Sequence, residues 1–319
     1  MDPPLHERAG FVGSAARFYH RTYFADYVGF VLLEAAYMLT KLLITPVHRP
    51  FTLDDRRIQN PHADPERVSS FENFIYAGVI PFGLLLVWAA VTRPGFHKAH
   101  VTVLGFLISV AMSSFLTHVF KNAIGRARPD LIARCHPAKG TPAHQLIDYH
   151  VCMQTDAYKL NDGWRSFPSG HSSFAFSGLG YFSMVLAGQL HSIRPRTDLA
   201  RVLIALVPLL GAFLVAASRT ADYRHDVYDV TAGSILGFAM AYFGYRRYYR
   251  SLWDPMCHVP YPSPADDEKE ERRLFAYKDP DEEAAASPRA ESFDLNDLSE
   301  DESRPLNAGS KGKQRQESR

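Results

Sequence analysis

Six apolar segments of 18 to 20 residues follow one another along the chain, and they constrain its fold more than any other feature of the sequence. A helix needs about 20 residues to cross the hydrocarbon core of a bilayer, where its backbone polar groups must pair within the helix itself. Each segment is therefore predicted to be a membrane-spanning helix. The predicted spans are Tyr27–Ile44, Phe74–Val91, Val101–Phe120, Ser172–Leu190, Leu199–Ala217 and Val227–Tyr245. The predicted fold class is all-α, a six-transmembrane helical bundle.

The two ends of the chain differ from this apolar part. Residues 1–23 mix arginines with Phe and Tyr, which is typical of a helix lying among lipid headgroups. From residue 251 onward Pro, Ser, Asp and Glu dominate, and Asp254–Arg319 holds 17 acidic and 10 basic residues. We therefore predict an N-terminal interfacial segment (1–23), a six-span domain (24–250) and a disordered acidic cytosolic tail (251–319).

An even number of spans places both termini on one side of the membrane. Short basic flanks on that side are typical of the cytosol, so we predict cytosolic termini. The loops 46–73, 121–170 and 218–226 then face the lumen or the exterior together, and 121–170 is expected to be helical or irregular. Basic residues are scattered at segment ends and form no single patch, so the expected partner is the bilayer and not nucleic acid. The oligomeric state is left open.

Two of the three cysteines, Cys135 and Cys152, fall in the 121–170 loop. They can form a disulfide if the loop faces an oxidising compartment, or they can remain free thiols. The chain has no CxxC pair, so a structural zinc site is not expected.

Three short polar motifs border the predicted spans on this shared face. Each motif alone is typical of an ordinary feature, such as a charged flank, a capped helix start or a surface His–Asp contact. All three in this order on one face indicate a single site. The motif residues are Lys121 and Arg128 (K-x6-R-P), Ser169, Gly170 and His171 (P-S-G-H), and Arg219, His225 and Asp229 (S-R-x5-H-x3-D).

These residue types fit phosphoryl transfer, because an anionic phosphate ester needs fixed cations around its non-bridging oxygens. Lys121, Arg128 and Arg219 would supply that charge. Ser169 would cap the helix that follows and donate to phosphate, and Gly170 would let backbone amides approach closely. Such a set of donors takes the place of a metal, so no metal is predicted.

The remaining motif residues are predicted to be catalytic. His225 would attack phosphorus, and Asp229, four residues later on the same helix face, would hold the other imidazole nitrogen. His171 would protonate the departing oxygen and later activate water.

On these three motifs the chain resembles the type 2 phosphatidic acid phosphatases, or lipid phosphate phosphatases, over roughly residues 20–250. It is most similar to the fungal diacylglycerol pyrophosphate phosphatase branch, through residues 124–130, 168–173, 209–212 and 51–55. The resemblance implies magnesium-independent dephosphorylation of phosphatidate, lysophosphatidate and diacylglycerol pyrophosphate through a phosphohistidine, with no cofactor. An endomembrane such as that of the vacuole is the expected location.

Other functions stay open. A polyprenyl-diphosphate or sphingoid-base phosphate phosphatase would use the same chemistry, and a non-enzymatic transporter or scaffold would not need it. A metal-dependent hydrolase could instead use Asp222 and Asp226 beside the motif His. Outside the motifs, Arg126 and Arg224 are interpreted as surface or headgroup contacts, and Asp162 as a brace of its loop.

Overall fold

The computed structural model describes residues 10–11, 14–15, 18–19 and 22–266, and in this part of the chain the regular structure is helical. Only isolated bridges, and no extended strands, occur in the described residues. The helices are α2 (Phe24–Leu43), α3 (Ser70–Phe74), α4 (Ile80–Thr92), α5 (Phe96–Ile124), α6 (Leu131–Cys135), α7 (Ala157–Asp162), α8 (Gly170–Leu190), α9 (Leu199–Ala221) and α10 (Val227–Tyr248). The all-α prediction is confirmed.

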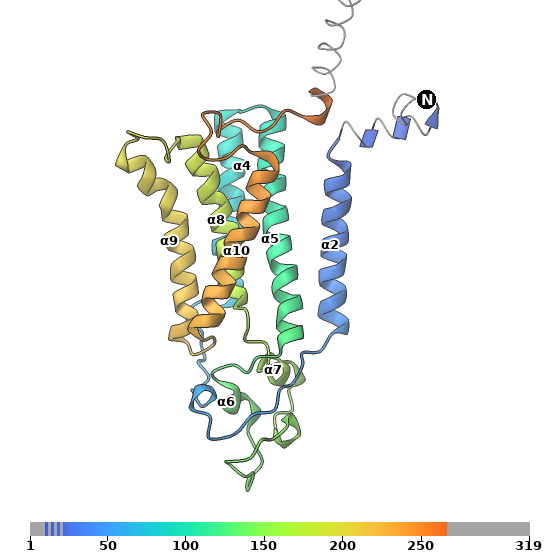
Figure 1. The fold of residues 1–319 in the computed structure, drawn as a ribbon, viewed down its shortest axis with the longest axis vertical. Helices are drawn as coiled ribbons and strands as arrows, with labels where there is room; N and C mark the ends of the chain where they lie inside the picture. The colour runs from blue at the N-terminus through green and yellow to red at the C-terminus, as the bar shows by residue number, and fades with distance from the viewer. Residues whose placement is uncertain (1–9, 12–13, 16–17, 20–21, 267–319) are drawn as a thin grey trace, which may run out of the picture. The chain divides into compact units, whose positions relative to one another are not determined.

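The long helices run side by side, with α6, α7 and the long loops gathered beyond one end of them (Figure 1). Helix α8 packs against α5, α9 and α10, and it also contacts α3 and α4. Helix α2 packs mainly on α5 and contributes no fully buried residue. The motif residues at the starts of α8 and α10 therefore lie on central helices, at the end of the bundle that carries the loops.

Glycines let the central helices approach closely. A Cβ atom on Gly237 of α10 would stand 2.2 Å from the carbonyl oxygen of Ser173 in α8. A Cβ on Gly178 of α8 would stand 1.9 Å from the carbonyl oxygen of Ala77. Neither separation is possible for a real side chain, so any larger residue would push these helices apart.

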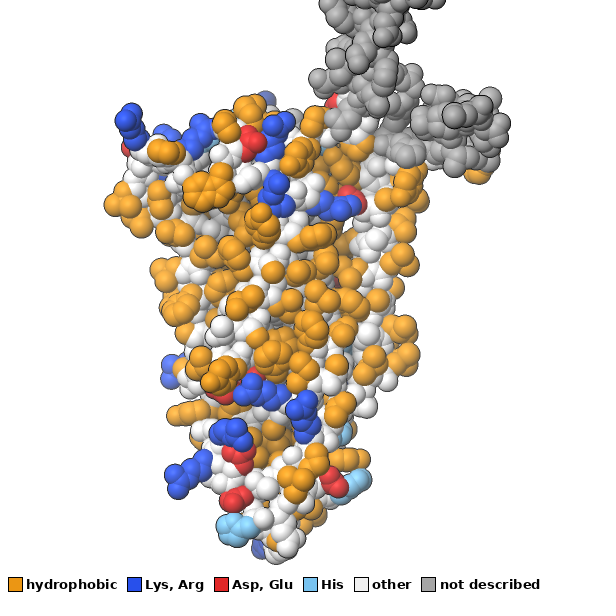
Figure 2. Space-filling view, in the orientation of Figure 1, with side chains coloured by type: hydrophobic (Ala, Val, Ile, Leu, Met, Phe, Trp, Pro, Cys, Tyr) orange, Lys and Arg blue, Asp and Glu red, His pale blue; other side chains and the backbone are white. Residues whose placement is uncertain are grey.

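Three helical segments are long and apolar enough to cross a membrane: Ser70–Thr92, Phe96–Ile124 and Leu199–Ala221. The six-span prediction is thus supported in part. Helix α2 carries Asp26, Glu34 and Lys41, while α8 and α10 are rich in Ser, Gly and Tyr, which lower their hydropathy. Hydrophobic side chains cover the flank of the bundle, and charged side chains gather towards its two ends (Figure 2).

The loops at one end form a small core of their own. It consists of Phe51, Ile58, Leu131, Cys135, Ile147 and Trp164. The indole nitrogen of Trp164 donates to the carbonyl of Arg49 at 2.9 Å, which joins the 121–170 loop to the 46–73 loop. Cys135 and Cys152 are bonded as a disulfide, the first of the two alternatives left open above.

The prediction of a disordered tail from residue 251 onward is wrong for residues 251–266. Residues 251–266 are described, and they fold back on the bundle because their apolar side chains find partners there. Cys257 is buried, its carbonyl accepts from the Tyr245 hydroxyl at 3.1 Å, and the Tyr261 amide donates to the carbonyl of Tyr248 at 2.9 Å. Most of the predicted interfacial segment 1–23 and all of 267–319 lie outside the described residues.

Candidate active site

A cavity of about 950 Å³ lies where the loops meet the ends of the helices. Six of the eight predicted site residues line it: Lys121, Arg128, Gly170, His171, Arg219 and His225. The other two lie directly behind, where the Ser169 amide donates to the carbonyl of Asp229 at 2.9 Å. Residues separated by up to about a hundred positions in the sequence are thus brought to one place by α5, α8, α9 and α10.

His225 is buried, and its contact with Asp229 differs from the predicted one. Its Nδ1 lies 3.7 Å from Asp229 Oδ2, too far for a direct hydrogen bond. The hydroxyl of Ser166 stands between them, 2.5 Å from Asp229 Oδ2 and 3.4 Å from His225 Nδ1. When Ser166 donates to the carboxylate, its lone pair faces Nδ1–H. Ser166 therefore relays the effect of Asp229 to Nδ1–H, and His225 Nε2 keeps a lone pair that can accept a hydrogen bond.

The other ring nitrogen of His225, Nε2, lies beside a cation. Arg128 Nη1 lies 3.3 Å from His225 Nε2. Burial, and next the charge of Arg128, hold the pKa of His225 well below its usual 6.5. His225 is therefore neutral at pH 7 and presents Nε2 towards the cavity, which is the form required of a nucleophile.

Local sequence fixes the start of α10. The Asp226 side chain caps the helix and accepts from the Val227 amide at 2.6 Å, while Asp229 Oδ2 accepts from the Asp226 amide at 3.1 Å. This capping box holds Asp229 beneath the preceding His225. Arg126 Nη1 forms an ion pair with Asp229 Oδ1 at 3.1 Å, so our interpretation of Arg126 as a surface contact is wrong.

Arg128 is held by the loop that carries α7. Its Nε donates to the carbonyl of Asp162 at 2.8 Å, and its Nη2 pairs with Asp162 Oδ1 at 2.9 Å. Burial alone would raise the pKa of Asp162, but Arg128 and Arg134 hold it well below its usual 3.8. Asp162 is thus charged, and it braces Arg128 as well as its own loop.

The remaining motif residues surround the same space. Lys121 Nζ donates to the carbonyl of Arg165, and a Cβ on Gly170 would lie 3.5 Å from Lys121 Cε. His171 Nε2 is buried without a hydrogen-bond partner in the part of the chain that the structure describes. Ser169 is fully buried and caps α8, where its hydroxyl accepts from the Ser172 amide, and its donation to phosphate stays a prediction.

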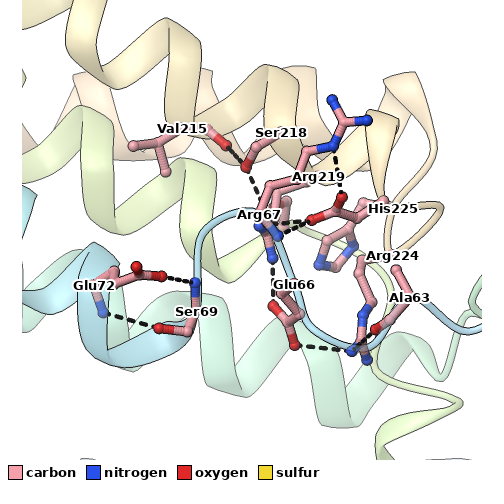
Figure 3. A network of polar contacts seen from close by, with 12 residues as sticks. Ala63, Glu66, Arg67, Ser69, Glu72, Val215, Ser218, Arg219, Arg224 and His225 are labelled. Carbon is pink, nitrogen blue, oxygen red and sulfur yellow. Dashed lines mark hydrogen bonds and ion pairs between the residues drawn. The ribbon is translucent and has the colours of Figure 1, made fainter.

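Arg219 is almost completely buried and uses each of its nitrogens. It donates to the Ser218 hydroxyl at 3.0 Å, to Glu66 Oε2 at 2.6 Å and to Asp222 Oδ2 at 3.2 Å. Glu66 also pairs with Arg224 at 3.0 Å, so Arg224 is part of the site and not a surface contact as we predicted (Figure 3). Sequence reasoning missed Glu66, because no motif or periodicity distinguishes it from other charged residues of its loop.

The carboxylates of the alternative metal site are engaged elsewhere. Asp222 pairs with Arg219 and Arg67, and Asp226 pairs with Arg126. No group of three or more His, Cys, Asp or Glu side chains gathers in a way that could hold a metal ion within the described residues. The metal-dependent alternative thus gains no support, and magnesium independence stays a prediction.

Comparison with known proteins agrees with this geometry. Residues 102–253, which contain all eight predicted site residues, match the PAP2 superfamily. Over 242 residues the chain is 40% identical to "Diacylglycerol pyrophosphate phosphatase 1" of Saccharomyces cerevisiae, covering 75% of this chain and 83% of that protein. The chain belongs to the PAP2 superfamily.

This PAP2 protein is also similar to a second fungal protein and to a plant protein. It is 36% identical to "Probable diacylglycerol pyrophosphate phosphatase 1" of Schizosaccharomyces pombe, over 77% of this chain and 87% of that one. It is 35% identical to "Lipid phosphate phosphatase 2" of Arabidopsis thaliana, over 57% of this chain and 62% of that one. No solved structure gives a significant match. The family resemblance inferred from the motifs is confirmed.

Proposed function

We propose that this PAP2 protein is an integral membrane lipid phosphate phosphatase that hydrolyses diacylglycerol pyrophosphate, phosphatidate and lysophosphatidate without magnesium. The observation that carries the proposal is that one cavity is lined by His225, whose Nε2 lone pair faces Arg128, and also by Lys121 and Arg219. The names of the relatives from both yeasts support this choice of substrate class.

The chemistry follows from the positions of the two histidines. His225 Nε2 attacks phosphorus and forms a P–N bond as the P–O bond to the leaving group breaks. His171 gives its proton to the departing oxygen. Water then attacks the phosphohistidine, His171 takes a proton from that water, and inorganic phosphate leaves. Arg128, whose Nη1 lies 3.3 Å from His225 Nε2, would turn its donors to the phosphate oxygens when substrate binds.

The cations supply what a metal would otherwise provide. Lys121, Arg128 and Arg219, which line the cavity, would offset the charge on the non-bridging oxygens as fixed, preorganised donors. We therefore expect the reaction to need no cofactor.

We also propose six membrane spans, with α2, α8 and α10 crossing beside the three most apolar segments, and with cytosolic termini. The disulfide between Cys135 and Cys152 supports a lumenal position for the loops, because disulfides persist in oxidising compartments. The cavity is also lined by Tyr37 and Leu42 of α2 and by Phe74 of α3. Lipid chains would therefore enter sideways between α2 and α3 from an endomembrane such as that of the vacuole.

The test is hydrolysis of phosphatidate and diacylglycerol pyrophosphate in detergent micelles, with and without EDTA. Wild type should be active under both conditions, and His225→Ala should lose activity by orders of magnitude. His144→Ala is the matched control, because His144 is exposed in the 121–170 loop and does not line the cavity. Loss of activity in EDTA, full activity of His225→Ala, or a higher kcat/KM on a prenyl diphosphate would contradict the proposal.

A further inference from the structure

Glu66 lies in the loop before α3, 153 positions from Arg219 in the sequence, and it reaches the cavity between two arginines (Figure 3). Its Oε2 accepts from Arg219 Nη1 at 2.6 Å, and its Oε1 lies 3.0 Å from Arg224 Nη2. All three side chains line the cavity, and both arginines are more than nine-tenths buried. The family motifs include Arg219 but assign nothing to Glu66 or Arg224.

Two further carboxylates connect Arg224 to the opposite wall. Arg224 Nη1 lies 3.8 Å from Asp130 Oδ2, the longest of these contacts, and Asp130 Oδ1 accepts from Arg134 Nε at 2.9 Å. Asp162 then bridges two arginines, because its Oδ2 pairs with Arg134 Nη1 and its Oδ1 with Arg128 Nη2, both at 2.9 Å.

These contacts form one alternating series, which we call the charge chain. Its members, in order of contact, are Arg219, Glu66, Arg224, Asp130, Arg134, Asp162 and Arg128. It begins and ends at the two arginines of the phosphatase motifs, both of which line the cavity. It holds four cations and three anions, so one further anion between its two ends would continue the alternation.

The alternation has an electrostatic reason. Four guanidinium groups around one cavity would repel one another if no carboxylates stood between them. Glu66 is the only carboxylate of the charge chain that touches Arg219. Asp222 also pairs with Arg219, but Asp222 is shared with Arg67. Without Glu66, no carboxylate would bridge Arg219 and Arg224, and their mutual repulsion would favour moving apart.

We propose that Glu66 is a positioning residue for the substrate phosphate. Its carboxylate fixes Arg219 opposite Arg128, so that a phosphate between these two arginines completes the charge chain. The role rests on the proposed function, because the completing anion is the phosphate of the lipid substrate. Glu66 acts through Arg219 and takes no part in bond making or breaking.

The test measures binding of inorganic phosphate to the full-length protein in detergent, from the rise in Tm with phosphate concentration. Glu66→Gln keeps the shape of the side chain but removes its charge. We expect this variant to bind phosphate about 10- to 150-fold more weakly, which corresponds to the free energy of a hydrogen bond to a charged group. KM for phosphatidate should rise in parallel. Glu66→Asp, which retains the charge on a shorter side chain, should lie between wild type and Glu66→Gln.

Two comparisons separate positioning from a merely structural role. Glu72→Gln removes a charge from the same segment but should leave phosphate binding unchanged, because Glu72 caps α3 and does not line the cavity. In an Arg219→Gln background, adding Glu66→Gln should weaken phosphate binding by less than about twofold. Glu66 acts through Arg219, so the effects of the two substitutions are not additive.

Three results would overturn the proposal: unchanged phosphate binding in Glu66→Gln, an undiminished effect in the Arg219→Gln background, or tighter phosphate binding in Glu66→Gln. The last would mean that Glu66 competes with phosphate for Arg219. Hydrolysis of phosphatidate by the wild type, followed in the same preparation, tests the proposed function separately, since phosphate binding needs no turnover.

Discussion

Ser166→Ala tests whether Asp229 acts on His225 through a hydroxyl. In the structure Ser166 Oγ lies 2.5 Å from Asp229 Oδ2 and 3.4 Å from His225 Nδ1, while Nδ1 and Oδ2 are 3.7 Å apart. Removing the hydroxyl leaves Nδ1–H without a close acceptor. The imidazole is then free to turn away or to change tautomer, and Nε2 no longer faces the cavity as a lone pair.

The size of the effect follows from the type of hydrogen bond. The Ser166 hydroxyl bonds to a fully buried carboxylate, and hydrogen bonds to charged groups contribute about 1.5–3 kcal/mol. At about 1.4 kcal/mol for each tenfold change, kcat/KM should fall roughly 10- to 150-fold. Asp229→Ala should cost more, because Asp229 also accepts from the Asp226 amide and pairs with Arg126.

The assay is phosphatidate hydrolysis in mixed micelles, with Tm measured on the same samples. Ser177→Ala is the matched control, because Ser177 is also fully buried but its hydroxyl donates only to a backbone carbonyl within α8. Ser177→Ala should keep kcat/KM within about twofold of wild type, as expected for loss of a hydrogen bond outside the site. If Ser166→Ala retains as much activity as Ser177→Ala, then Asp229 holds His225 directly and the relay is refuted.

Three other outcomes follow from the structure. First, burial lowers the pKa of His225, so between pH 6.5 and that lowered pKa the unfolded chain binds a proton that the folded chain does not. The free energy of unfolding should therefore fall as pH drops below about 6.5, and Tm measured from pH 7.5 to 5 should fall less for His225→Ala. Second, Gly237→Ala should lower the stability by about 1–3 kcal/mol or more, because its Cβ meets a backbone oxygen of α8. Gly83→Ala, which meets no atom within 4 Å, should leave Tm unchanged or raised, and equal Tm values for both variants would contradict the close helix approach. Third, replacing Cys135 and Cys152 by serine opens a loop of 17 residues and should lower the free energy of unfolding by about 3 kcal/mol, measured by denaturant unfolding. An unchanged free energy of unfolding would show that the disulfide does not constrain the unfolded chain.

The positions of the helices and most of the catalytic residues could be predicted from the sequence, because both depend on local patterns. Apolar runs of sufficient length identified the long helices within a few residues of their ends. The spacing of His225 and Asp229 placed them on one face of a helix start, and Gly170 and His171 stand at the predicted start of α8.

The supporting contacts could not be predicted, because they join residues far apart in the chain. Glu66 meets Arg219 only when the 46–73 loop folds over the end of the bundle. Ser166 stands five residues before His171, but its bridging position depends on where α10 begins. Residues 251–266 are ordered because they pack on α10. Their composition, with several Pro residues, does not predict this contact.

The central claim is that His225 forms a covalent bond to phosphorus. The most direct measurement is to mix wild type with phosphatidate that carries a radiolabelled phosphate and to quench the reaction rapidly. Peptides are then mapped under alkaline conditions, in which a P–N bond survives. If His225 is the nucleophile, the label lies on the imidazole of His225 in wild type and is absent from His225→Ala. Label on another residue, or label that persists in His225→Ala, would contradict it.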